Sequence, residues 1–405
     1  MQPYVSSVAI FFLSILWAYL LTPFVIAVAH RVGGVDKPGA RKVHAVVMPR
    51  IGGVAIALST ALAMAPGLLI DSVHPAVARN IGFLAALLWG GGIVFLLGLY
   101  DDLKGTNAPW KFFFQALAAC IAYSLGFRFT VIGLPFFGSV DLGYWSFPMT
   151  LVWIVGVVNA MNLVDGLDGL AAGLSLIVCV SVGSIAAFRG DSMSLLLCLA
   201  LAGALLGFLR YNWNPARIFM GDSGSMFIGF VLALLALRSS TKSPTAIAVT
   251  VPILALGVPV FDTLFVMWFR FRDGAEFSLT DRILRMFRAD RNHLHHLLLE
   301  SFEGHHRGAV VAIYSLGIVF SLGALSVAYL NNQSQGYLVL LLGLVAVAMV
   351  RAAASRSRQA ASARADSGGS PGDDPSVSPV ELVSLPLSKA DRAAGEVLDS
   401  RRSTR

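Results

Sequence analysis

The sequence contains little charge for its length. Of its 405 residues only 13% are Asp, Glu, Lys or Arg, whereas a soluble globular chain has about 25%. Hydrophobic residues make up 56% of the chain, and the mean hydropathy is +0.74. The length alone would permit two or three soluble domains, but this composition excludes them and predicts a chain packed largely among lipid-embedded helices.

Cysteine is also scarce, and each of the three, Cys120, Cys179 and Cys198, lies in an apolar stretch. They form no disulfide framework and no paired metal-binding motif. The formal net charge is +7. In a membrane protein an excess of positive charge is first explained by the Lys and Arg residues in the loops that orient the chain. It therefore gives little reason to expect a nucleic-acid partner.

Long apolar runs predict an all-α polytopic integral membrane protein with about eleven transmembrane helices. The first run, from about Val5 to Ala29, is too long for a signal-peptide core and lacks a basic leader, so we expect a retained span. The predicted helices lie near 4–29, 51–70, 80–100, 111–127, 148–163, 169–188, 193–210, 223–238, 245–269, 308–329 and 336–352.

The distribution of basic residues predicts the orientation. Sixteen Lys and Arg residues fall in loops on one side of these helices and five on the other. Because basic loops stay in the cytoplasm, we expect the N-terminus outside and, with an odd number of spans, the C-terminus inside. The protein is then a multi-pass protein of a bacterial inner membrane.

Two segments depart from the helical pattern. Residues 128–145 alternate polar and apolar residues around Gly138-Ser139, which predicts a small β-hairpin on the outer side. From about residue 353 the composition turns to Ser, Ala, Arg, Asp and Pro. We therefore expect a transmembrane catalytic domain over 1–352 and a disordered cytoplasmic tail over 353–405.

Five acidic residues stand at the predicted cytoplasmic mouths of helices, in Gly- or Asn-rich settings. They are Asp101, Asp102, Asp165, Asp168 and Asp222. The Asn159-x-x-Asn162-x-x-Asp165-x-x-Asp168 spacing predicts one slanted polar stripe on a helix, which is costly in lipid unless it faces a wet cavity. Interhelical hydrogen bonding by the asparagines is the alternative.

The other two acidic motifs suggest distinct chemistry. Adjacent carboxylates such as Asp101 and Asp102 point in different directions on a helix, so we expect separate roles. Asp222 lies in Gly221-Asp222-Ser223-Gly224-Ser225 at the start of a predicted span, where free N–H groups favour phosphate. A simple capping turn is the alternative.

Basic residues and histidines occur in two predicted cytoplasmic loops. The first loop contains Arg41, Lys42 and His44, and its cations could clamp phosphate as well as orient the chain. The last contains Arg288, Arg291, His293, His295 and His296. A zinc site there lacks supporting ligands at tetrahedral spacing, so contact with an anionic substrate suits the loop better. Asp262, inside the ninth predicted helix, is expected to have a buried support role.

Carboxylates together with phosphate-binding groups indicate Mg²⁺, or Mn²⁺, and a polyphosphate substrate at the cytoplasmic face. These motifs, from the Asp101-Asp102 pair to the His293-x-His295-His296 segment, resemble the polyprenyl-phosphate N-acetylhexosamine-1-phosphate transferase family over about residues 36–300. The resemblance implies a Mg²⁺-dependent enzyme that transfers a sugar 1-phosphate from a UDP-sugar to polyprenyl phosphate, such as undecaprenyl phosphate, and releases UMP. The sequence does not decide whether the protein forms a homodimer.

The resemblance also implies roles for individual residues. Asp222 and Asp168 would bind the metal, and Asp101, Asp102 and the three histidines would be catalytic. Substrate contacts would come from Lys42, His44, Asn162, Asp165, Asp168, Asn212, Phe219, Arg288 and Arg291, with Asn212 and Phe219 near uracil.

Two features favour one branch of this family. The last loop reads His-Leu-His-His rather than three consecutive histidines, and Val-Met-Pro-Arg precedes Gly52-Gly53 where the peptidoglycan branch tends to have Thr-Pro-Thr. The chain therefore resembles the branch that uses UDP-GlcNAc to start a lipid-linked envelope polysaccharide. The alternatives are a phospho-MurNAc-pentapeptide translocase of peptidoglycan synthesis and a secondary transporter, although no internal repeat supports a transporter.

Overall fold

The computed structural model describes most of the chain between residues 2 and 366. The described ranges are 2–36, 47–68, 79–134, 138–241, 251, 253–273, 278, 282, 293–302, 304–330 and 333–366. The chain divides into two units, Met1–Ala354 and Ser355–Arg405. The site lies entirely in the first unit.

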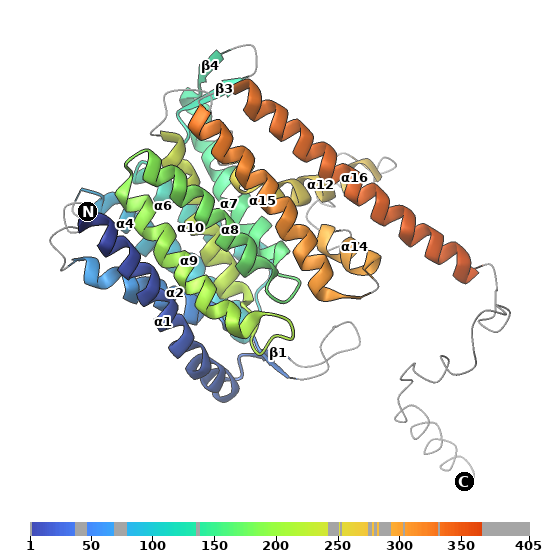
Figure 1. Ribbon diagram of the computed structural model, residues 1–405, viewed down its shortest axis with the longest axis horizontal. Coiled ribbons are helices and arrows are strands. Elements are labelled where there is room, and N and C mark those ends of the chain that lie inside the picture. Colours follow the sequence, from blue (N-terminus) through green and yellow to red (C-terminus); the bar gives the residue numbers. More distant parts are fainter. Residues whose placement is uncertain are drawn as a thin grey trace, which may run out of the picture. The chain divides into compact units, whose positions relative to one another are not determined.

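Thirteen α-helices account for most of the described residues (Figure 1). Each of the eleven predicted apolar segments overlaps one of them. They are α1 (Gln2–Val32), α2 (Gly53–Met64), α4 (Ile81–Ala86), α5 (Gly92–Lys104), α6 (Ala108–Ser124), α7 (Ser146–Val164), α8 (Leu170–Phe188), α9 (Ser192–Asn212), α10 (Gly221–Thr241), α12 (Gly257–Asp273), α14 (Leu294–Ser301), α15 (His306–Leu330) and α16 (Gln333–Asp366).

The fold is mostly helical rather than all-α, because two short antiparallel sheets are present. The predicted hairpin is confirmed as β3 (Val131–Leu134) paired with β4 (Gly138–Asp141), although Gly138 and Ser139 lie in the second strand and not in the turn. The second sheet, β1 (Val35–Asp36) with β2 (Met48–Pro49), was not predicted. Strands of two residues are too short to show a period in the sequence.

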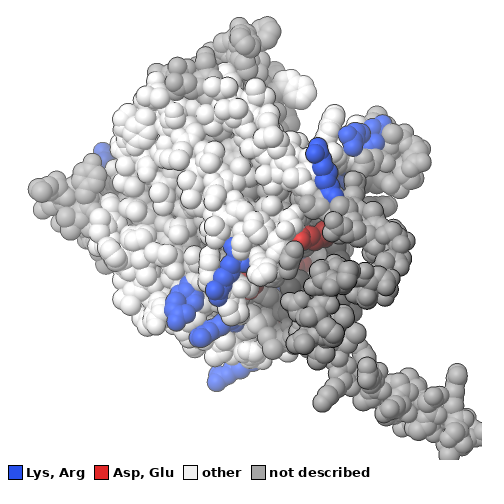
Figure 2. Space-filling model, turned by 45° about the vertical axis from the view of Figure 1, so that its right-hand side comes forward, with Lys and Arg blue, Asp and Glu red and all other residues white. Residues whose placement is uncertain are grey.

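The helices are those of a polytopic membrane protein. Seven of the described helical segments, which lie within α1 to α15, are long and apolar enough to cross a bilayer, and α2 and part of α16 are shorter apolar helices. Large apolar side chains such as Phe24, Val152 and Leu322 are exposed. On the face in Figure 2 a broad uncharged area is bordered mainly below and to the right by Lys and Arg. Such a surface suits lipid contact.

Helix α10 lies at the centre of the bundle, and its middle stretch from Met226 to Leu237 is almost entirely buried. Glycines let neighbouring helices approach its N-terminal end closely. A Cβ on Gly53 of α2 would lie 2.0 Å from the Gly224 nitrogen, and one on Gly98 of α5 would lie 2.4 Å from the Asp222 carbonyl oxygen. Larger residues would therefore push α2 and α5 away from the residues that α10 presents.

Toward the C-terminal end of the chain the described helices depart from the predicted segments. The ninth predicted segment, 245–269, becomes α12 from Gly257, with 242–250 outside the described residues. The last predicted segment, 336–352, lies inside α16, which continues to Asp366. Helix α14 was missed because eight residues give barely two turns of periodicity. The tail predicted to be disordered over 353–405 instead continues α16 as far as Asp366, and 367–405 falls outside the described residues.

Candidate active site

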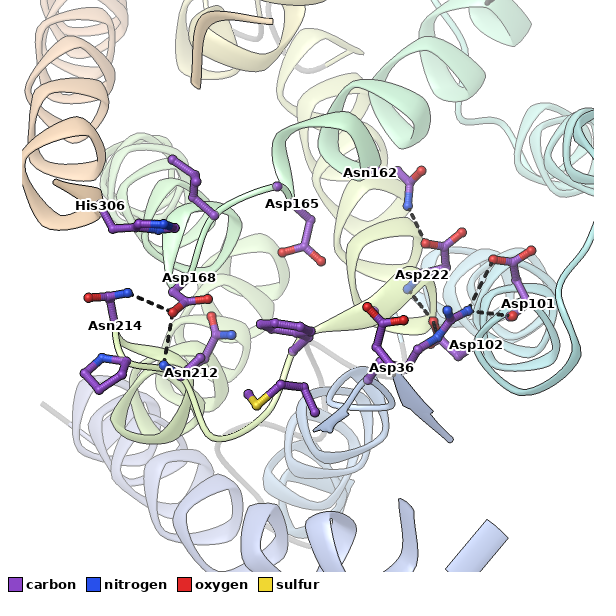
Figure 3. A pocket seen from close by; sticks show the side chains of 18 of the residues that line it. Asp36, Asp101, Asp102, Asn162, Asp165, Asp168, Asn212, Asn214, Asp222 and His306 are labelled. Carbon is purple, nitrogen blue, oxygen red and sulfur yellow. Dashed lines mark hydrogen bonds and ion pairs between the residues drawn. The ribbon is translucent and has the colours of Figure 1, made fainter. Parts of the chain in front are cut away.

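A cleft of about 650 Å³ opens where the ends of α5, α7 and α9 meet the start of α10 (Figure 3). Most of the residues that line it are polar, and they include the five acidic residues at the predicted helix mouths. The lining residues are Asp36, Met48, Arg50, Asp101, Asp102, Lys111, Asn162, Asp165, Gly166, Leu167, Asp168, Asn212, Asn214, Pro215, Ala216, Phe219, Gly221, Asp222 and His306.

Asp102 caps the N-terminus of α10 from a neighbouring helix. Its Oδ1 accepts a hydrogen bond from the Asp222 backbone N–H at 2.9 Å, and its Oδ2 accepts from the Ser223 N–H at 3.0 Å and the Ser223 hydroxyl at 2.7 Å. A carboxylate at this end also complements the helix dipole. The approach requires glycine at position 221, where φ is +74° and a Cβ would lie 2.6 Å from Asp102 Oδ2. Asp102, not Asp222, is thus the capping acid.

Asp222 projects into the cleft between two nitrogen donors. Lys111 Nζ lies 2.5 Å from its Oδ2, and the Asn162 amide donates to its Oδ1 at 3.0 Å. The same Lys111 Nζ lies 3.0 Å from Asp101 Oδ2, so one ammonium bridges two carboxylates. Asp101 and Asp102 therefore point to different partners, as their adjacency predicted.

Arg50 is the second cation at this end of the cleft. Its guanidinium donates to the Asp101 carbonyl oxygen at 2.8 Å and lies 3.5 Å from Asp102 Oδ1. Two cations thus face three carboxylates, and Asp165 adds a fourth. We call this group, Arg50, Lys111, Asp101, Asp102, Asp165 and Asp222, the acidic end of the cleft.

The predicted polar stripe breaks where α7 ends. Asn159 and Asn162 lie on α7, but the helix stops at Val164, Asp165 is its C-cap, and Asp168 lies in the turn before α8. Asn159 donates to Gln115 Oε1 at 2.7 Å, in keeping with the interhelical alternative, whereas Asn162 reaches Asp222. Gly166 follows directly, and a turn there ends the helical spacing on which the stripe depended.

Asp165 lies between Asp168 and Asp222 in the cleft (Figure 3). Burial, together with the negative charges of Asp222 and Asp102, raises the pKa of its carboxyl well above the usual range. Burial is the larger cause, and the neighbouring carboxylates add to it. A cation bound nearby would favour the ionised form.

The other end of the cleft is built from amides rather than from charge pairs. Asp168 Oδ2 accepts from the Asn214 amide and from the Ala216 N–H, both at 3.0 Å. Asn212 donates to the Ile218 carbonyl at 2.8 Å and accepts from the Gly169 N–H at 3.1 Å. These bonds hold the 213–217 loop in place, and Phe219 also lines the cleft.

The three predicted histidines lie on or beside α14 and do not line the cleft directly. His293 is the N-cap residue of α14, and its ring stacks on that of His295 at 5.9 Å. The ring of His295 lies against Gly166, where a Cβ would be 2.4 Å from Nε2. Burial, with His296 and His293 nearby, lowers the pKa of His295 to about 3, so this imidazole is neutral. A different histidine, His306, lines the cleft.

Four of the predicted residues, Lys42, His44, Arg288 and Arg291, fall outside the described residues. In turn the cleft contains Lys111, Asp36, Asn214 and His306, which the sequence did not single out as site residues. Lys111 carried a usable signal, because it follows the Asn107 cap at the start of an apolar helix, close after the Asp101-Asp102 pair. Asp36 lies in the two-residue strand β1, Asn214 in a loop and His306 at the start of α15, so no periodic pattern marks them.

The acidic end of the cleft suits Mg²⁺ bound by one or two carboxylates rather than by a full cage of protein ligands. Within the described part of the chain no group of three or more His, Cys, Asp or Glu side chains surrounds a common metal position. Magnesium needs no such cage, because it usually takes one or two carboxylates and completes its shell with water and substrate phosphate. Asp222 and Asp165 have carboxylate oxygens that could serve as such ligands, and Asp165 is buried beside the negative charges of Asp222 and Asp102.

Comparison with known proteins places this arrangement in a family. Residues 84–240, which contain most of the cleft acids and α10, match the model of glycosyl transferase family 4. A probable undecaprenyl-phosphate N-acetylglucosaminyl 1-phosphate transferase of Bacillus subtilis is 37% identical over 319 residues, covering 78% of this chain and 84% of the relative. The chain belongs to glycosyl transferase family 4.

Two further relatives in family 4 match over a similar length. A decaprenyl-phosphate N-acetylglucosaminephosphotransferase of Mycolicibacterium smegmatis is 36% identical over 77% of this chain and 80% of its own. An undecaprenyl-phosphate alpha-N-acetylglucosaminyl 1-phosphate transferase of Escherichia coli K12 is 26% identical over 77% and 81%. Membership makes the chain a phosphoglycosyl transferase, and the resemblance stated from the motifs is confirmed.

Proposed function

We propose that this protein transfers GlcNAc-1-phosphate from UDP-GlcNAc to a polyprenyl phosphate and releases UMP. The acidic end of the cleft carries the proposal, because it joins carboxylates that suit a divalent cation to Lys111 and Arg50, which suit phosphate. The names of the family 4 relatives support the donor sugar, and they include both undecaprenyl and decaprenyl acceptors.

In the proposed reaction a phosphate oxygen of the acceptor attacks the β-phosphorus of the donor. A new P–O bond forms to the acceptor, the bond between the β-phosphorus and the bridging oxygen breaks, and UMP leaves with that electron pair. The acceptor phosphate has a second pKa near 6, so it is mostly dianionic at neutral pH and needs no strong base. We therefore favour direct displacement over a covalent aspartyl intermediate.

The residues of the cleft have different roles in the proposed reaction. Asp222 and Asp165 would hold Mg²⁺, which when bound neutralises charge on the donor pyrophosphate. Lys111 can exchange its contacts with Asp101 and Asp222 for phosphate oxygens, and Asp102 keeps α10 in position through its backbone N–H groups. Asp168 already has one oxygen engaged with the 213–217 loop, which suits orientation of the donor better than metal binding.

The remaining assignments belong to the same proposal. Asn212 and Phe219 would lie near uracil at the amide end of the cleft, and the histidines of α14 would act beside Asp165 from behind Gly166. Lys42, His44, Arg288 and Arg291 would add phosphate contacts from the two loops. We also propose eleven spans with the N-terminus outside, which places the cleft at the cytoplasmic face of a bacterial inner membrane.

A panel of UDP-sugars tests the donor. Purified protein is incubated with polyprenyl phosphate and Mg²⁺, and UMP release is measured for each sugar. We expect release with UDP-GlcNAc that depends on both the acceptor and the metal. Preference for UDP-MurNAc-pentapeptide would move the protein to the peptidoglycan branch, and solute uptake into vesicles without UMP release would revive a transporter.

A further inference from the structure

A buried carboxylate outside the cleft joins three helices at the histidine segment. Asp262, on α12 and 2% exposed, accepts from the Arg351 guanidinium of α16 at 2.6 Å. It also accepts from the Leu294 N–H at the start of α14, at 2.8 Å, and contacts His293 Nδ1 at 2.9 Å. The expected support role of Asp262 is confirmed, and its main cationic partner comes from a helix far along the chain.

The charges and the hydrogen bonds of this group are matched. Arg351 is 6% exposed, so its positive charge is itself buried and balances that of Asp262. An ionised carboxylate is an acceptor only, and His293 therefore donates through Nδ1. This fixes the tautomer and the plane of the ring in the way that a carboxylate orients a functional histidine.

The group lies behind the cleft, one layer away from the proposed metal ligands. His293 stacks on His295, whose ring packs against Gly166, and Gly166 is the neighbour of Asp165 in the chain and lines the cleft. Because Asp262, His293 and His295 are all buried, water cannot replace a hydrogen bond that is lost at Asp262. The histidines keep their place only while the N-terminus of α14 is held.

We infer that Arg351, through Asp262, is a positioning residue that holds the histidines of α14 against the cleft. The last helix is then part of the catalytic architecture and not only an additional membrane span. This inference rests on the proposed function for its activity readout. It is independent of that function in its structural readout.

The test compares Arg351→Gln with Arg351→Lys, which keeps the charge, and with Arg356→Gln, which removes an exposed cation from the same helix. Turnover of UDP-GlcNAc and backbone amide exchange are measured for each full-length protein. We expect Arg351→Gln to lower kcat about tenfold or more and to speed exchange at residues 293–301 while leaving α9 protected. Arg351→Lys should restore most of both properties, and Arg356→Gln should match the unaltered protein.

A second variant covers the case in which Arg351→Gln does not fold. Asp262→Asn keeps the size of the side chain and an oxygen for the Leu294 N–H, and it should show the same local exchange with a similar loss of kcat. Unchanged exchange and turnover in Arg351→Gln would overturn the inference. So would protection lost throughout the protein with no rescue by lysine, because Arg351 would then only stabilise the fold.

The two proposals fail in different ways. If the unaltered protein releases no UMP from UDP-GlcNAc, the proposed function fails, and the exchange measurements still decide whether Arg351 holds α14.

Discussion

Helix α10 carries an ionic cluster at each end, and the two clusters differ in balance. At its N-terminus four carboxylates face Lys111 and Arg50 in an open cleft. Near its C-terminus Arg238 binds both oxygens of Asp191 at 2.8 Å and donates to Asn80 Oδ1 at 2.6 Å. The clusters are sixteen residues apart on one helix, or about 24 Å at 1.5 Å per residue.

The difference in charge balance distinguishes the candidate active site at the N-terminus of α10 from a pair that supports the fold near its C-terminus. The Asp191–Arg238 pair is 5% and 8% exposed, Arg238 contacts both oxygens of Asp191, and Ser194 adds a hydrogen bond, so the pair ties α9, α10 and the start of α4 together. The acidic end instead keeps an excess of negative charge, and burial together with that charge raises the pKa of Asp165. Excess charge beside a cleft costs stability unless a ligand compensates it, and this is why it marks the site.

The largest effect should come from removing one charge at the acidic end. Asp222→Asn keeps the shape of the side chain but removes a proposed metal ligand, so UMP release in Mg²⁺ buffer should fall about 1,000-fold. The variant should remain folded, because an amide can still meet Lys111 and Asn162. Near-normal turnover would remove Asp222 from the proposed metal site.

Breaking the balanced pair should cost stability instead. Arg238→Gln leaves the Asp191 carboxylate buried without its cation, which costs about 3–5 kcal/mol of folding free energy. Thermal unfolding in detergent measures the loss. The fraction that remains folded should turn over at a normal rate, and the double variant Arg238→Met/Asp191→Leu should recover much of the stability. A kcat that falls without loss of stability would mean that this end also serves catalysis.

Removing the bridging ammonium should have an intermediate effect. Lys111→Met takes the positive charge from between Asp101 and Asp222, so the carboxylates repel one another and phosphate loses a partner. We expect kcat/KM to fall about 100-fold. Lys104→Met, which alters an exposed cation at the end of α5, is the matched control. Equal losses in both variants would indicate a general effect of charge.

The smallest expected effect is a dependence on pH of the stabilisation that Mg²⁺ gives to the folded protein. In the folded protein the pKa of Asp165 is raised above its ordinary value of 3.8. At a pH between these two pKa values the folded protein holds a proton that the unfolded chain has released. The free energy of unfolding therefore falls as the pH rises through this range. A cation that favours the ionised carboxylate opposes this loss. Mg²⁺ should therefore raise the melting temperature by more at pH 8 than at pH 5.5, and Asp165→Asn should remove most of that difference. An equal Mg²⁺ effect at both pH values would contradict the assignment of Asp165.

The periodic part of the molecule could be predicted from the sequence, and the contacts between distant segments could not. Apolar runs located a helix in each of eleven places because burial in lipid requires long apolar segments with every backbone group bonded internally. The residues from Asn159 to Asp168 were predicted to form one polar stripe at helical spacing, and the stripe breaks at Asp165 because the chain turns there. Lys111 was overlooked because its two carboxylate partners come from α5 and α10.

By itself the sequence determined that this chain is a membrane protein and to which family it belongs, and it singled out five acids that line the cleft. A chain with so few charged residues must place its helices in lipid. The spacing of a motif can be seen in the sequence without knowing what surrounds the motif in the fold. Tertiary structure alone decided the roles within the set. Asp102 caps α10, Asp222 faces the cleft, and Arg351 reaches Asp262 across 89 positions. Such pairings depend on which helices pack together, and interactions across the bundle leave no period in the chain.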